Sequence, residues 1–231
     1  MFEAYRGLSS RMSSPLAPTR VSRTRAEARA GYDRIAGIYD WLAGASERPF
    51  RRRALDFLDL QQGESVLEIG CGTGEALVEL AGLSPEVTGV DLSPRMLERA
   101  RRRLDAAGRS ARLIEGDAHA LPVADASQDA VFMSFVLDLV DTPELPGFLA
   151  EVRRVLRPGG RLALVTMSAD SGSALPMRLY AWAHRVFPVA VDCRPVHLAA
   201  VLEAGGFRPE RLQQGAMWGL GVAWALARPR G

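Results

Sequence analysis

Three acidic residues and a cluster of glycines occupy positions where a ligand-binding loop would be expected. The run from Glu68 to Gly74 reads Glu-Ile-Gly-Cys-Gly-Thr-Gly and ends a short apolar stretch. Glycines let the backbone approach a ligand closely. Asp91 ends the next apolar stretch, and Asp117 follows the one after that. Because a carboxylate offers two acceptor oxygens, Asp91 could bind both hydroxyls of a ribose, while Asp117 could accept from an adenine amine.

The glycine loop differs from two common nucleotide-binding motifs. The dinucleotide pattern G-x-G-x-x-G would need a glycine at position 75, where Glu75 stands. A carboxylate there would face a pyrophosphate, which is unfavourable. A P-loop would need Gly-Lys-Ser/Thr, and none follows. The loop therefore disfavours both dinucleotide binding and P-loop nucleotide binding.

These residues fall at the junctions of a regular alternation of strands and helices. Strands are expected at 65–69, 87–90, 112–114, 129–135 and 161–167, and helices at 75–83, 94–107, 145–156 and from Pro195 to Gly205. Such alternation favours a parallel sheet with helices on both faces. Ligands bind such sheets at the carboxyl ends of the strands. Two strand-like runs around Gly215, at about 208–227, predict a hairpin that closes the sheet.

Several segments lie outside this alternation. Residues 1–23 predict a mobile N-terminal arm, and 24–231 a single domain. Within that domain, we expect residues 24–60 to form an N-terminal helical cover and residues 168–198 to form an insertion on the substrate side. The polar run at 169–173 could act as a hinge. Both segments carry apolar stripes at helical spacing, formed by Tyr32, Ile35, Tyr39 and Leu42 in the first and by Leu175, Leu179, Trp182 and Val186 in the second.

Four segments together resemble the class I S-adenosylmethionine-dependent methyltransferases. They are Glu68–Gly74, Val90–Ser93, Gly116–Pro122 and Arg154–Gly160, which reads Arg-Val-Leu-Arg-Pro-Gly-Gly. The resemblance covers about residues 30–227. Tyr32-Asp33 through Tyr39-Asp40, with Asp117–Pro122, are most similar to the ubiquinone/menaquinone-biosynthesis methyltransferases, and also similar to bacterial phospholipid N-methyltransferases. The resemblance implies a Rossmann-like α/β fold with a mostly parallel seven-stranded sheet, helices on both faces and an antiparallel last strand.

The same resemblance implies that the cofactor is S-adenosyl-L-methionine and that residues at the strand ends hold it. Those around the methionine part would be Glu68, Gly70, Gly72 and Gly74. Those around the ribose and adenine would be Asp91, Leu92, Met96, Asp117 and Ala118. Ser134 would lie near the transferred methyl group. Tyr32 and Tyr39 would belong to the helix that covers the cofactor.

The acceptor side is less determined by the sequence. Methyl transfer from a sulfonium is a direct displacement, so alignment of the two reactants supplies much of the catalysis. A phenol, an enol or a ring carbon can also need a base. The candidates are Asp138, His184, Asp192 and His197. Asp138 is favoured because it follows the strand that leads to the methyl group in this class. No metal is expected, since no cluster of ligating residues has metal-site spacing.

Composition and sequence motifs indicate which classes of partner and which compartment to expect. The formal charge of +2, from 29 basic and 27 acidic residues, argues against nucleic acid as the main partner. Ser134-Phe135-Val136-Leu137 also differs from the Asp/Asn-Pro-Pro-Tyr/Phe motif of amino-methylating nucleic-acid enzymes. Two cysteines, no long apolar span and no signal-peptide core predict a cytoplasmic protein, with peripheral membrane contact left open.

The preferred function is methyl transfer to a small, largely apolar acceptor of quinone-like, phenolic or other secondary-metabolite type. The alternative is N-methylation of a phospholipid headgroup. A nucleic-acid methyltransferase and a non-catalytic cofactor-binding protein are weaker alternatives. Whether carbon, nitrogen or oxygen is methylated stays open, as does the oligomeric state.

Overall fold

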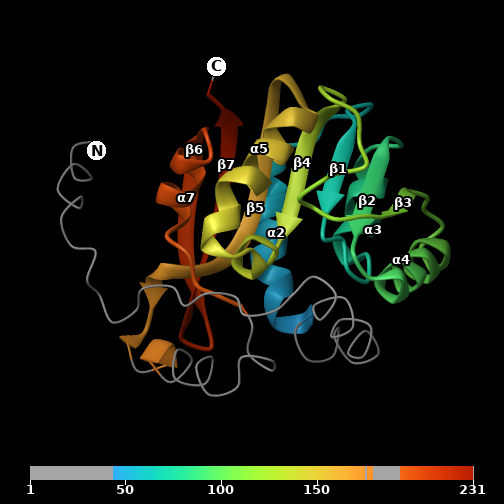
Figure 1. The fold of residues 1–231 in the computed structure, drawn as a ribbon. Helices are drawn as coiled ribbons and strands as arrows, with labels where there is room; N and C mark the ends of the chain where they lie inside the picture. Colours follow the sequence, from blue (N-terminus) through green and yellow to red (C-terminus); the bar gives the residue numbers. More distant parts are fainter. Residues whose placement is uncertain (1–43, 175, 179–192, 231) are drawn as a thin grey trace.

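The computed structural model describes residues 44–174, 176–178 and 193–230, and its centre is a twisted sheet (Figure 1). In these residues the sheet has seven strands in the order β3-β2-β1-β4-β5-β7-β6. The strands are β1 (Val66–Ile69), β2 (Val87–Asp91), β3 (Arg112–Glu115), β4 (Gln128–Ser134), β5 (Leu156–Gly172), β6 (Phe207–Met217) and β7 (Leu220–Pro229). β1 to β5 are parallel, and β7 is antiparallel to both β5 and β6. The predicted fold class is confirmed.

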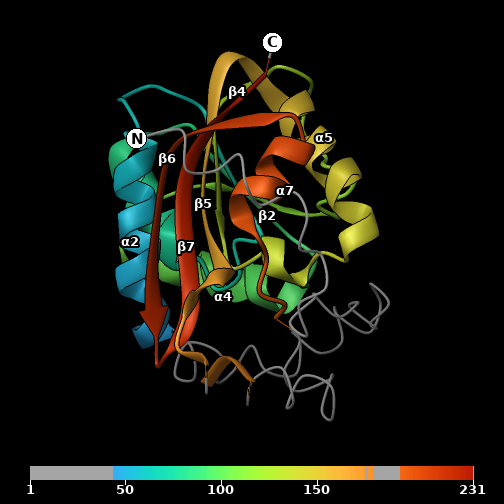
Figure 2. The same ribbon diagram turned by 90° about the vertical axis from the view of Figure 1, so that its left-hand side faces the viewer.

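Helices cover both faces of the sheet (Figures 1 and 2). The longer helices are α2 (Ala45–Leu58), α3 (Glu75–Leu83), α4 (Pro94–Ala106), α5 (Leu145–Val155) and α7 (Leu198–Ala204). Helices α2, α3 and α4 pack on one face, where Ala54 and Phe57 meet Val66 in one apolar cluster. Helices α5 and α7 pack on the other face, where Phe148 joins the cluster that contains Leu67. Adjacent residues of β1 serve opposite faces because side chains alternate along a strand.

The predicted hinge at 169–173 is largely part of the sheet. Strand β5 runs on to Gly172, which pairs with Leu220 of β7. The hydroxyl of Ser171 donates to the carbonyl oxygen of Gly215 at 3.1 Å. Gly172 has φ +95°, and a Cβ there would lie 2.5 Å from the backbone nitrogen of Gly221. The hinge prediction was wrong for 169–172, because the long hairpin strand β7 supplies partners that the polar sequence does not reveal.

The last helix also begins later than predicted. Val196 forms a parallel bridge with Ser168, so α7 starts at Leu198 rather than at Pro195. Within the predicted helical cover at 24–60, residues Ala45–Leu58 form α2. Residues 24–43 of that cover and the predicted arm at 1–23 lie outside the described residues, as does the apolar stripe formed by Leu175, Leu179, Trp182 and Val186.

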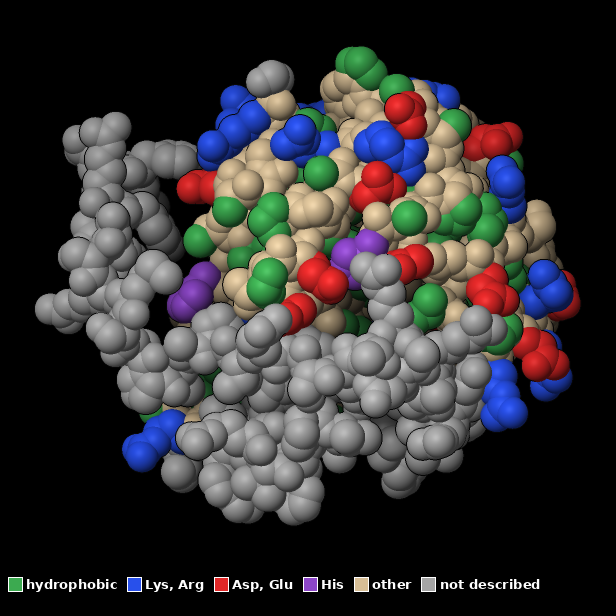
Figure 3. All heavy atoms as spheres, viewed as in Figure 1, with side chains coloured by type: hydrophobic (Ala, Val, Ile, Leu, Met, Phe, Trp, Pro, Cys, Tyr) green, Lys and Arg blue, Asp and Glu red, His purple; other side chains and the backbone are tan. Residues whose placement is uncertain are grey.

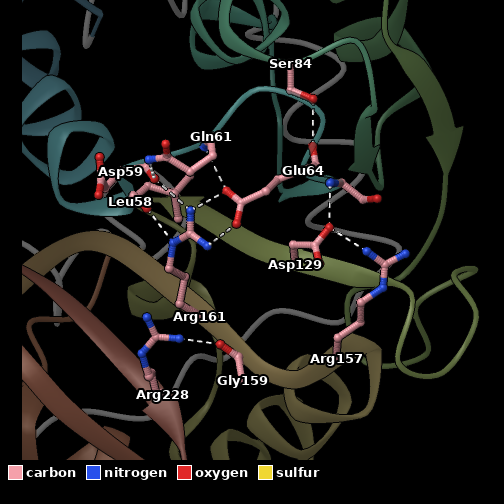
Figure 4. Close-up of polar contacts among 11 residues, drawn as sticks. Leu58, Asp59, Gln61, Glu64, Ser84, Asp129, Arg157, Gly159, Arg161 and Arg228 are labelled. Atoms are coloured by element: carbon pink, nitrogen blue, oxygen red, sulfur yellow. Dashed lines mark hydrogen bonds and ion pairs between the residues drawn. The ribbon is translucent and has the colours of Figure 1, made fainter.

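Arg161 of β5 ties the end of α2 to the sheet (Figure 4). Its guanidinium donates to the carbonyl oxygens of Leu58 and Asp59, at 2.5 and 2.8 Å. It also forms two hydrogen bonds with the Glu64 carboxylate, at 2.8 and 2.6 Å. The side-chain hydrogen bond from Arg161 lowers the pKa of Glu64. These contacts hold the C-terminal end of α2 against the sheet.

We predict that Arg161→Met lowers the free energy of unfolding by about 2–4 kcal/mol at neutral pH, because two carbonyls and a carboxylate lose their donor. Urea titration measures this change. Because the pKa of Glu64 is lowered in the folded state, the ion pair stabilises the fold above the carboxyl's ordinary value of 4.5 and stops doing so as the pH falls below it.

The matched control for this prediction is Arg157→Met. Arg157 pairs with Asp129 and is more exposed than Arg161, so its loss should cost less than about 1 kcal/mol. Equal stability of wild type and R161M at neutral pH would show that the contacts of Arg161 do not support α2.

Candidate cofactor site

The carboxyl ends of three neighbouring strands meet at one edge of the sheet (Figure 1). Ile69 of β1 pairs with Val90 of β2 on one side and with Met133 of β4 on the other. The next residues along these strands are Gly70, Asp91 and Ser134. The structure therefore brings together the glycine loop, the ribose-binding candidate and the residue predicted near the methyl group.

The glycine loop is enclosed by the segments on either side of it. Gly70 has φ +66°, and a Cβ there would lie 2.5 Å from Cγ2 of Val136, just after β4. Gly74, the N-cap of α3, has φ +82°, and a Cβ there would lie 2.9 Å from Cα of Ala100 on α4. Larger residues would force these segments apart, so glycines give the loop both its conformation and its close packing.

The carboxylate of Asp91 holds the loop and the start of α4 in place. The backbone N–H of Gly72 donates to Oδ2 of Asp91 at 2.8 Å, and the N–H of Ser93 donates to Oδ1 at 2.8 Å. Ser93 in turn caps α4, since its hydroxyl oxygen accepts from the N–H of Met96 at 3.1 Å. A carboxylate has about four acceptor positions. Both oxygens of Asp91 therefore retain the capacity to accept from ribose hydroxyls.

The residues predicted around adenine follow the ends of β2 and β3. Met96 is buried in the first turn of α4, and Leu92 is half-buried just before it. The Oδ1 atom of Asp117 accepts from the backbone N–H of His119 at 2.9 Å and lies 3.0 Å from its Nδ1. Ala118 packs against the core. His119 thus contacts Asp117 directly, which fits a structural role in shaping this loop.

Glu68 lies buried on the face of the sheet that α2 and α3 cover. It is 2 % exposed, and its Oε2 atom has no hydrogen-bond partner in the described residues. Burial raises the pKa of Glu68 well above its ordinary value, Asp91 and Glu79 add to the rise, and Arg51 opposes it. A buried acceptor without a partner carries a free-energy cost. It fits a ligand that brings a cationic group to the glycine loop.

Two arginines support the loop from outside and were missed in the sequence, because each stands in a run of three that resembles a solvated helix face. Arg51 of α2 is 6 % exposed and pairs with the carboxylate of Glu75, the first residue of α3. Arg103 of α4 donates to the hydroxyl and carbonyl oxygens of Thr73, at 2.6 and 2.9 Å. The signal for Arg51 is its spacing from Ala54 and Leu58, which share its buried face.

The predicted acid–base candidates lie in different surroundings. Asp138, in the short 3₁₀ helix η3 (Leu137–Leu139), is fully buried, and Thr166 donates to its Oδ1 at 2.9 Å. His197 precedes α7, has a side chain 55 % exposed, and contacts Asp170 at 2.6 Å. His184, Asp192, Tyr32 and Tyr39 lie outside the described residues, and their roles stay predictions.

The chain is similar in sequence and in fold to several known proteins. A methyltransferase-domain profile matches residues 66–160. The demethylmenaquinone methyltransferase of Thermus thermophilus is 35 % identical over 164 residues, 68 % of this chain and 73 % of that protein. The Tropheryma whipplei enzyme of that name is 39 % identical over 161 residues, 67 % of this chain and 65 % of that protein. A solved methyltransferase structure from Methanosarcina mazei has a TM-score of 0.61, 25 % identity and coverage of 76 % and 96 %.

The chain belongs to the class I S-adenosylmethionine-dependent methyltransferases. Within that class it is similar to the ubiquinone/menaquinone-biosynthesis methyltransferases. The cofactor of this class is S-adenosyl-L-methionine, and the Oε2 atom of Glu68, which has no hydrogen-bond partner among the described residues, fits its cationic methionine end. The chain spans slightly less than two thirds of the length of the Tropheryma whipplei protein.

Three further features of the described residues concern metal binding, membrane spans and surface charge. No group of three or more His, Cys, Asp or Glu side chains among them could hold a metal ion. None of the helices in the same part of the chain is long and apolar enough to cross a membrane. Acidic and basic side chains are interspersed on the face shown in Figure 3.

We predict that Glu68→Gln makes the fold more stable at about pH 8, because a neutral amide of similar shape removes the cost of a buried charge. Since the folded-state pKa of Glu68 is raised, the wild type loses stability as the pH rises from 4.5 through that pKa. The stability advantage of E68Q should therefore shrink as the pH is lowered toward 4.5. Thermal unfolding over a pH series measures it.

The matched control is Glu98→Gln, at an exposed position on α4. Its unfolding temperature should follow that of the wild type across the series. If E68Q and E98Q behave alike, Glu68 is not strained by burial, and the electrostatic argument for a cationic ligand fails.

Proposed function

We propose that this chain transfers a methyl group from S-adenosyl-L-methionine to a small, largely apolar acceptor. The observation that carries the proposal is the convergence of Glu68, the glycine loop and Asp91 at the edge where β1 and β2 end. When bound, the cofactor supplies a methyl group on a positively charged sulfur. In this arrangement Glu68 would accept from the amino group of the methionine part, and Asp91 from the ribose hydroxyls.

The acceptor class is supported by the relatives. Demethylmenaquinone, after which the Thermus and Tropheryma enzymes are named, carries an apolar fused ring. A reduced ring of this kind is a reasonable acceptor for this chain as well. The predicted covers at 24–44 and 168–198 would wall the pocket, since the sheet edge supplies only its floor. A cytoplasmic location belongs to the same proposal and is supported by the two free cysteines, Cys71 and Cys193.

We predict that the purified chain binds S-adenosylmethionine and S-adenosylhomocysteine, and does not bind NAD. Asp91→Ala should weaken binding of both by about ten- to hundredfold, because the ribose hydroxyls lose a charged acceptor. Isothermal titration calorimetry at neutral pH measures these affinities. Asp105→Ala, which changes an exposed acid at the end of α4, is the control and should bind as the wild type does.

Two results would count against this assignment. No heat with either compound, from protein shown to be folded by circular dichroism, would refute cofactor binding. Unchanged affinity in D91A would remove Asp91 from the site while leaving the rest of the proposal standing.

We also predict that methyl transfer is independent of metal ions. The described residues offer no metal-binding cluster, and displacement at a sulfonium needs no Lewis acid. Activity should stay the same, within about twofold, after dialysis against EDTA. Loss of activity with EDTA and recovery with magnesium would reveal a metal site formed with residues outside those described.

A further inference from the structure

Helix α2 carries a second charged residue toward the glycine loop. Glu47 lies in its first turn, four residues before Arg51, so the two side chains share one face of the helix. The helix begins near the edge at which β1 and β4 end (Figure 1). Glu47 is half-buried there. It therefore lies near the end of the sheet at which the cofactor is predicted to bind, with Asp138, just after β4, and Glu75, just after the glycine loop, among its charged neighbours.

The charged groups that face Glu47 come from three elements. They are Asp138 of η3, Arg51 of α2 itself and Glu75 at the start of α3. Arg51 is paired with Glu75, and Thr166 holds Asp138 from β5. These anchored neighbours fix the electrostatic surroundings of Glu47 between the glycine loop and the end of β4.

Two buried atoms in this region have no hydrogen-bond partner among the described residues. They are Oε2 of Glu68 and Nε of Arg51, in residues that are 2 % and 6 % exposed. Buried polar groups are nearly always hydrogen-bonded in folded proteins. A polar ligand bound at the glycine loop would be placed to supply partners for these atoms.

We propose that Glu47 is the general base of the methyl transfer and takes the proton that the acceptor loses. This inference rests on the proposed function. In the step, an electron pair of the acceptor forms the bond to the methyl carbon. The carbon–sulfur pair stays on sulfur, which becomes a neutral thioether. The proton leaves the acceptor's hydroxyl group or ring carbon and binds a carboxylate oxygen of Glu47.

The ionisation of Glu47 suits this role. Burial, with smaller contributions from Asp138 and Glu75, raises the pKa of Glu47 to about 7, and Arg51 opposes the rise. A general base is most effective when its pKa lies near the working pH. Glu47 can therefore be ionised before transfer and can hold a proton after it.

The other candidates suit the role less well. Asp138 is fully buried and receives a hydrogen bond from Thr166, so its carboxylate is placed to influence Glu47 rather than to exchange protons with solvent. His197 lies on the surface beside Asp170. We therefore favour Glu47 over Asp138 and His197 as the base, with Asp138 acting through its charge on Glu47.

The test compares wild type, Glu47→Gln and the control Asp56→Asn, which changes an exposed acid on the same helix. The probe acceptor is dithionite-reduced demethylmenaquinone with a short isoprenoid tail, used with tritiated S-adenosylmethionine. E47Q should lower kcat by about a hundredfold or more. Its affinity for S-adenosylhomocysteine, measured by calorimetry, should stay within about twofold of wild type. D56N should match wild type in both measurements.

The pH profile separates a base from a merely structural residue. Wild-type kcat should rise about tenfold per pH unit up to about pH 7 and then level, because only the ionised carboxylate accepts a proton. E47Q should lack this rise. An E47Q enzyme with wild-type kcat, or with the same rise below pH 7, would overturn the proposal.

A second measurement tests Glu47 in case the probe acceptor is not methylated. If wild-type protein binds cofactor but does not methylate the reduced quinone, the proposed acceptor class is wrong. Infrared difference titration of wild type against E47Q then tests Glu47 directly. A carboxyl band that titrates near pH 7 and is missing in E47Q supports its role. Absence of such a band from wild type overturns it.

Discussion

The site depends on the parallel pairing of β1 with β2 on one side and with β4 on the other. This register ends the three strands at one level, so that the glycine loop, Asp91 and Ser134 meet without any long connection between them. A slip of one residue in β1 would turn Glu68 to the opposite face of the sheet. Gly89, opposite Glu68, helps to set this arrangement, because a Cβ there would lie 2.8 Å from Leu77 of α3.

Two acidic side chains at this edge lower the stability of the fold and serve the proposed function. Glu68 and Glu47 both have raised pKa values, chiefly because burial disfavours their charged forms. Arg51 offsets part of this cost for both carboxyls and anchors α2 to α3 through Glu75. Proteins retain such unfavourable groups mainly at functional sites. A bound cationic cofactor would offset the cost of burying a charged Glu68. A proton taken from the acceptor would neutralise Glu47.

Much of the fold and the acidic residues at the strand ends could be predicted from the sequence, because hydrophobic periodicity reports local structure. The prediction of a helix at 75–83 matches α3. Arg51 and Glu47 were missed because their burial arises from tertiary contacts: Arg51 meets a glutamate 24 residues away. The extension of β5 through 168–172 was missed for the same reason, since pairing with β7 overrides a polar, loop-like composition.

The most direct test of this account is a crystal structure with S-adenosylhomocysteine. The account predicts that the amino group of the ligand lies within hydrogen-bond distance of Glu68, with the glycine loop against its methionine part and the ribose hydroxyls on Asp91. That complex would give the buried Oε2 of Glu68 the partner that the described residues do not supply. A ligand bound with its ribose away from Asp91 and its amino group away from Glu68 would contradict the account.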